Sequence, residues 1–142
     1  MLIMWIHPIL QLLATVAGCY VLYLGFHRFM MLHMNRKMPF DWKKHVYWGK
    51  IAIGIWMIGL ALGLFFAWVG WGVILITDWH YLIAFMVIPT GICAFVTGYI
   101  LDKYKKRRKL LPLLHGLNNL LLMVLVFFQL YTGILIIRDY LL

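Results

Sequence analysis

The chain has 142 residues, 65% of them hydrophobic, and a mean hydropathy of +0.93. Soluble domains are about 45–50% apolar, so this composition excludes an ordinary soluble fold and indicates a single membrane domain over residues 1–142. The net charge of +9 could suggest nucleic-acid binding, but the basic residues lie in short loops between apolar runs. That distribution argues against nucleic acid as a partner and favours a lipid membrane.

Four apolar runs are long enough to cross a bilayer, whose hydrocarbon core of ~30 Å needs roughly 20 helical residues. In chain order they predict helices at about 8–27, 46–69, 79–101 and 112–138. Pro8 and Pro112 stand at first helical turns, where proline is tolerated, and Pro89 predicts a kink inside the third helix. We therefore expect an all-α fold, an antiparallel four-helix bundle that is integral to the membrane.

The basic residues predict the orientation of this bundle. Six Lys and Arg residues lie between positions 28 and 50, six lie between 103 and 109, and only Arg138 falls on the other side. Because basic loops stay in the cytoplasm, both long loops are expected there, with both chain termini outside. The expected location is the bacterial cytoplasmic (inner) membrane.

Four of the six histidines begin the four predicted helices, namely His7, His45, His80 and His115. Since the helices alternate in direction, His7 and His80 share the outer level, and His45 and His115 share the inner level. Two imidazoles at one level are what a b-type haem takes as axial ligands, and facing helices of a bundle commonly supply them. The pattern predicts two bis-histidine haems, non-covalent because neither cysteine belongs to a CxxCH motif. Interfacial histidines bonded to headgroups are the simpler alternative.

A glycine follows each of these histidines at the same spacing. The residue 18 positions later lies on the same azimuth of a helix, about 27 Å further along. Those residues are Gly25, Gly63, Gly98 and Gly133. We expect each helix to offer a histidine to the haem at its own start and a glycine, which admits a flat macrocycle closely, to the haem at its far end.

The other residues on these faces are mostly small or polar. They are Gln11, Ala14 and Gly18; Gly49, Ala52 and Gly59; Ala84, Gly91 and Ala94; and Asn119 and Gln129. Small-residue helix packing is the alternative explanation for them.

Haem propionates attract cations near the membrane surface. Arg28 and Lys50 are the candidates at the inner level, where their alternative role is topogenic charge. Arg138 is the candidate at the outer level, although it could instead pair with Asp139.

Further polar residues have less defined roles. Asn118, Asn119, Gln129 and Thr132 of the fourth helix are expected to form interhelical hydrogen bonds, to orient the His115 ring, or to line a quinone pocket. His33 falls in the first basic loop, and His27 lies about 200° around the helix from His7. Both are expected to be surface residues.

The His7-Pro8 start, the His115-Gly-Leu-Asn segment and Phe-Gln-Leu-Tyr-Thr-Gly at 128–133 resemble the cytochrome b561-like di-haem membrane cytochromes, in particular their four-helix, superoxide-oxidase-like branch. The resemblance implies two haem b groups, held by His7 with His80 and by His45 with His115, and electron exchange with the quinone pool. We therefore expect electron transfer between quinone and a redox partner, with a cytochrome subunit of a larger oxidoreductase complex as another reading. A superoxide:quinone oxidoreductase and a haem-free membrane anchor are the alternatives, so enzymatic activity stays open and no catalytic residue is assigned.

Overall fold

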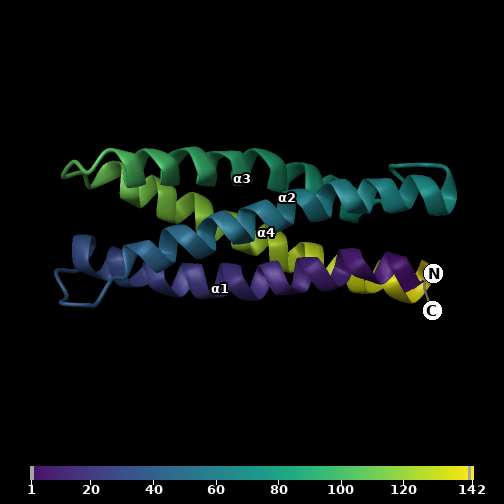
Figure 1. Ribbon diagram of the computed structural model, residues 1–142, viewed down its shortest axis with the longest axis horizontal. Coiled ribbons are helices and arrows are strands. Elements are labelled where there is room, and N and C mark those ends of the chain that lie inside the picture. Colours follow the sequence, from purple (N-terminus) through teal and green to yellow (C-terminus); the bar gives the residue numbers. More distant parts are fainter. Residues whose placement is uncertain (1, 141) are drawn as a thin grey trace.

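The computed structural model describes residues 2–140 and 142, and it folds them into four long helices that follow one short 3₁₀ helix (Figure 1). The elements are η1 (Leu2–Trp5), α1 (Ile6–His33), α2 (Trp42–Trp71), α3 (Trp79–Lys103) and α4 (Leu110–Tyr140). Each α-helix is long and apolar enough to span a membrane. The predicted all-α bundle of four such helices is therefore confirmed.

The helices extend beyond their predicted ends, most of all α1, which continues from residue 27 to His33. Nothing stops it earlier, because residues 28–33 contain neither glycine nor proline. The chain turns at Asn35, whose φ of 49° is left-handed, and the N–H groups of Met34 and Arg36 both donate to the carbonyl of Met30. The hydropathy of the sequence predicts only where the helix leaves the hydrocarbon layer. The turn at Asn35 decides where the helix itself ends.

Both ends of α2 are capped. The Asp41 carboxylate accepts the backbone N–H of Lys44 at 3.1 Å, and this hydrogen bond lowers the pKa of Asp41. At the other end Gly72 takes a left-handed φ of 71° and donates its N–H to the carbonyl of Trp68 at 2.9 Å. Glycine adopts this conformation without steric cost, so the helix ends there.

Two antiparallel hairpins make up the bundle. Helix α1 packs along α2, which we call hairpin 1, and α3 packs along α4, which we call hairpin 2. Figure 1 shows both hairpin loops at one end of the molecule, and both chain termini with the α2–α3 link at the other. The loop of hairpin 2 contacts the start of α2, since the Lys105 ammonium lies 3.6 Å from the centre of the Trp42 ring. The basic residues thus gather at one end, as their order in the sequence predicted.

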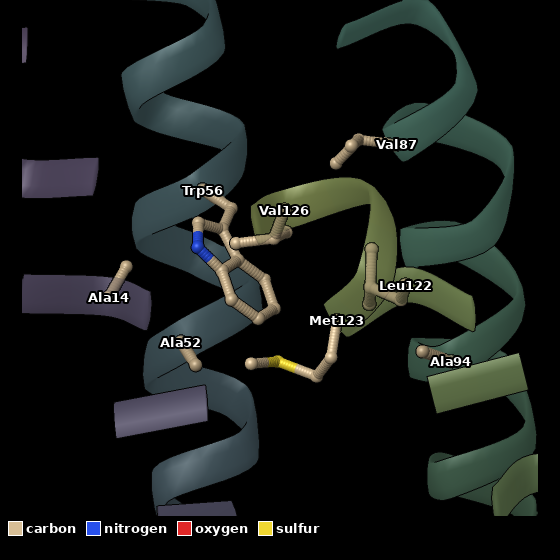
Figure 2. Close-up of a cluster of buried hydrophobic side chains, with 8 residues drawn as sticks. All are labelled: Ala14, Ala52, Trp56, Val87, Ala94, Leu122, Met123 and Val126. Atoms are coloured by element: carbon tan, nitrogen blue, oxygen red, sulfur yellow. The ribbon is translucent and has the colours of Figure 1, made fainter. Parts of the chain in front are cut away.

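The hairpins meet around Trp56 at mid-height (Figure 2). The Trp56 ring packs over Gly18, where an added Cβ would come within 2.7 Å of Cη2. Around it lie the other buried apolar side chains of this cluster: Ala14, Ala52, Val87, Ala94, Leu122, Met123 and Val126. Of the small residues on the predicted faces, Gly49 and Ala84 are half-buried. The others are buried, namely Ala14, Gly18, Ala52, Gly59, Gly91 and Ala94, so these faces point inward.

Candidate functional site

The structure brings the four helix-initial histidines and the four glycines together in two clusters. The terminal layer, at the end where both termini lie, contains His7, Gly63, His80 and Gly133. The basic layer, at the end of the basic loops, contains Gly25, His45, Gly98 and His115. Each helix contributes its histidine to one layer and its glycine to the other. The histidines and glycines therefore lie at the levels along the bundle that helix direction and the 18-residue spacing predict.

The two imidazoles of each layer lie at nearly the same separation. The ring centroids of His7 and His80 are 6.3 Å apart with an interplanar angle of 81°, and those of His45 and His115 are 6.2 Å apart at 72°. Two imidazoles that bind one metal from opposite sides, with metal–nitrogen distances of about 2.0–2.1 Å, have centroids about 6.4 Å apart. The centroid separation of each edge-to-face pair is therefore close to that of two imidazoles bound to one metal atom.

A larger metal cluster is not found. No group of three or more His, Cys, Asp or Glu side chains comes together as a metal site within residues 2–140 and 142. A bis-histidine haem needs only two protein ligands, because the porphyrin supplies the others. The donor set of each layer therefore fits haem and does not fit a tetrahedral zinc site.

Each imidazole rests on a glycine of the antiparallel helix in its own hairpin. A Cβ added to Gly63 would lie 2.9 Å from Cε1 of His7. At Gly25, Gly98 and Gly133 the corresponding distances to the facing imidazole are 3.2, 3.2 and 3.3 Å. The sequence led us to assign these glycines to a flat macrocycle. In the structure, the group that they admit is the imidazole ring.

In hairpin 1 the ring nitrogens bond to the backbone. His7 Nδ1 lies 2.7 Å from the carbonyl oxygen of Gly59, and His45 Nδ1 lies 3.1 Å from that of Val21. Each carbonyl belongs to the residue four positions before the glycine on which the ring rests. A carbonyl only accepts, so Nδ1 carries the proton and Nε2 keeps its lone pair.

In hairpin 2 threonine hydroxyls take this role. Thr132 Oγ1 lies 2.9 Å from His80 Nδ1, and Thr97 Oγ1 lies 2.8 Å from His115 Nδ1. Thr132 was among the polar residues noted from the sequence, but Thr97 was missed. Thr-Gly occurs at 90–91, 97–98 and 132–133, and only the last two of these glycines lie 18 residues after a histidine, so the dipeptide and this spacing together could have identified Thr97.

Two amides lie at the remaining ring nitrogens of hairpin 2. Gln129 Nε2 is 3.1 Å from His80 Nε2, and Asn119 Nδ2 is 3.3 Å from His115 Nε2. An amide NH₂ only donates, so His80 Nε2 carries a lone pair, as in hairpin 1. Asn119 Nδ2 lies 3.3 Å from both ring nitrogens of His115 and donates to the His115 backbone carbonyl at 2.7 Å. Gln129 Oε1 is buried without a hydrogen-bond partner among the described residues, which leaves an unsatisfied acceptor in the terminal layer.

No family model, curated protein or solved structure matches this chain.

The three cations expected near the propionates have other contacts. The Arg28 guanidinium lies 5.7 Å from the centre of the Phe40 ring, and Lys50 Nζ lies 4.0 Å from Asp102 Oδ2. Arg138 Nε lies 2.7 Å from Asp139 Oδ1, which is the alternative pairing considered for it. Asn118 Nδ2 of α4 donates to the carbonyl of Thr90 in the neighbouring helix α3 at 2.9 Å, which is the interhelical hydrogen bond expected of Asn118.

The expectation that His27 is a surface residue was wrong, as was the expectation that His33 lies in the first basic loop. His27 is buried, and its Nδ1 donates to the carbonyl of Pro39 at 2.8 Å, because the loop after α1 folds back over the helix. His33 is the last residue of α1, with its ring 5.0 Å from that of Phe29. The azimuth of His27 on its helix correctly separates it from the layers, but it does not predict that the following loop folds back over this side chain.

Proposed function

We propose that the protein is a membrane b-type cytochrome that holds one non-covalent haem in each layer and transfers electrons between the quinone pool and a redox partner. The observation that carries this proposal is the pair of histidine layers, with ring centroids 6.3 and 6.2 Å apart. His7 and His80 would hold the group in the terminal layer, and His45 and His115 would hold it in the basic layer. Haem supplies reversible one-electron transfer when it is bound.

The chain's own residues prepare these ligands. A hydrogen bond at Nδ1 fixes the tautomer and the rotation of each ring, and it raises the basicity of the nitrogen that meets the metal. The four glycines let the rings approach the neighbouring helix. Apolar helices around the layers exclude water, and this burial is one determinant of a haem's reduction potential.

A groove between α2 and α3 supports the proposal that the protein exchanges electrons with a lipid-soluble molecule. It has a volume of about 280 Å³, and its lining includes Lys50, Gly54, Met57, Gly91 and Phe95. Quinones are apolar apart from their head group, so a mostly apolar groove with one cation in its lining suits one. We propose this groove as the entry for quinone.

The charge distribution supports the orientation. Both basic loops lie at one end of the bundle, and the positive-inside rule would place that end in the cytoplasm of a bacterial inner membrane. A basic surface of this kind would also suit an acidic redox protein or a neighbouring subunit of a larger complex.

The deciding experiment is a dithionite-reduced-minus-oxidised absorption spectrum of the purified protein, with a pyridine haemochrome count. We expect two low-spin b haems per chain. A colourless, well-folded protein that also fails to take up added haem would overturn the proposal. That result would favour a haem-free membrane anchor, in which the histidines serve helix packing.

A further inference from the structure

We infer that Thr97 and Thr132 are positioning residues, each of which holds the tautomer of one histidine in hairpin 2 and thereby controls metal binding in one layer only. Thr97 would act on the basic layer through His115, and Thr132 would act on the terminal layer through His80. The effect on haem rests on the proposed function, whereas the effect on the tautomer does not.

The direction of each hydrogen bond follows from a count of protons. Thr97 Oγ1 lies 2.6 Å from the carbonyl of Cys93, and Thr132 Oγ1 lies 3.1 Å from that of Phe128. A carbonyl cannot donate and a hydroxyl has one proton, so we assign that proton to the hydrogen bond within the threonine's own helix. With this assignment each hydroxyl accepts from Nδ1–H of the histidine. A hydroxyl that already donates is a stronger acceptor, because hydrogen bonds in a chain polarise one another.

The residue just before each glycine decides which partner the imidazole finds. In hairpin 1 these residues are Leu24 and Leu62, which offer no polar atom, and the ring reaches a backbone carbonyl. In hairpin 2 they are Thr97 and Thr132, and the ring meets a hydroxyl first. Successive residues point about 100° apart on a helix, so this position flanks the glycine while the glycine itself leaves room for the ring.

Each layer consequently combines one imidazole bonded to a carbonyl with one bonded to a hydroxyl. The backbone partner cannot be removed by substitution, but the hydroxyl can. Hydrogen-bond partners of metal-bound histidines typically contribute about 10–100-fold to metal affinity. We expect a loss of that size in one layer when the hydroxyl of that layer is removed.

The test uses Thr97→Val and Thr132→Val, with haem affinity measured by titration of the haem-free protein in detergent. Thr97→Val should weaken only the basic layer and Thr132→Val only the terminal layer, by roughly 10–100-fold, and serine at either position should restore binding. Thr90→Val is the matched control, since Thr90 Oγ1 makes the same bond to its own helix, 2.9 Å from the Met86 carbonyl, without facing an imidazole. If a valine variant does not fold, Thr97→Ala and Thr132→Ala replace it.

A second readout needs no haem. In ¹⁵N-histidine NMR spectra of the haem-free protein, His115 should show the Nδ1–H tautomer in the wild type and in Thr97→Ser, and a tautomer mixture in Thr97→Val. Unchanged tautomers and unchanged haem affinity in both valine variants would overturn the inference. A wild-type protein that binds no haem, with tautomers that respond as expected, would instead overturn the proposed function and leave the role of the threonines standing.

Discussion

Hairpins 1 and 2 both place imidazole rings against glycines, but they supply different hydrogen-bond partners to the ring nitrogens. In both, an imidazole from the start of one helix lies against a glycine near the end of the other, at contact distances of 2.9 to 3.3 Å from an added Cβ. In hairpin 1 the ring nitrogen reaches a backbone carbonyl, and in hairpin 2 it reaches a threonine hydroxyl. The difference shows that the glycine and the level along the helix are the shared requirements, while the hydrogen-bond partner varies.

The layers cut across the hairpins, because each takes one histidine from hairpin 1 and one from hairpin 2. The largest expected effect therefore comes from single histidine substitutions. His7→Ala and His80→Ala should both empty the terminal layer, although they belong to different hairpins, and leave one haem per chain. His45→Ala and His115→Ala should both empty the basic layer.

A pyridine haemochrome count on each variant, with circular dichroism as the check of folding, measures this effect. If any one of these variants loses both haems while its helices remain intact, the layers do not bind independently. If His7→Ala and His80→Ala empty different layers, the pairing of the histidines is wrong.

Replacing a glycine that faces an imidazole with alanine tests how closely the ring and the helix must approach in each hairpin. Gly63 has the shortest contact and Gly133 the longest, at 2.9 and 3.3 Å from the facing imidazole, and both serve the terminal layer. Gly63→Ala should lower haem affinity there by roughly tenfold, the size typical of disturbing a ligand's surroundings, and Gly133→Ala by less. Gly54→Ala is the control on the same helix as Gly63, because an added Cβ there meets nothing within 4 Å.

The control should match or slightly exceed the wild-type melting temperature, since alanine favours a helix by about 0.8–1 kcal/mol over glycine. Haem titration and thermal unfolding report the two effects separately. An equal loss of haem affinity in Gly54→Ala and Gly63→Ala would show that the close contact is unimportant.

Trp56 joins the two hairpins, since its ring packs over Gly18 of hairpin 1 near Met123 of hairpin 2. Trp56→Ala should destabilise the bundle by about 3–5 kcal/mol, the usual cost of removing a large buried ring. Both layers should weaken together, because the hairpins would separate at mid-height. Trp68→Ala is the control, with a side chain 58% exposed, and should change the melting temperature little. A loss confined to one layer would contradict the joining role.

The smallest effect concerns the start of α2. The Lys44 N–H lowers the pKa of the Asp41 carboxyl below its usual 3.8, so the cap stabilises the first turn above that value and is lost as the pH falls through the lowered pKa. Asp41→Ala should speed hydrogen exchange at the Lys44 amide at neutral pH. Asp41→Asn should keep the cap and remove its pH dependence. Exchange that is equally slow in the alanine variant would show that the cap does not hold this turn.

The number of helices, their direction and the level of each histidine could be predicted from the sequence. These features depend only on the length and order of the apolar segments, given the helix rise and the bilayer thickness. The 18-residue spacing worked for the same reason, since it needs only the 3.6-residue turn. This local geometry was enough to group His7 with His80 and His45 with His115. It also identified the buried small residues of the first three helices.

Tertiary structure alone decided what each imidazole touches. The bonds of His7 to Gly59 and of His80 to Thr132 each join residues 52 positions apart, and no local pattern links such pairs. The return of the 34–41 loop over His27 is likewise a contact between segments. The sequence by itself determined which groups share a level, because level depends on one helix at a time. Only packing between helices decided which atoms meet, since a ring bonds to whichever acceptor the neighbouring backbone and side chains place at its edge.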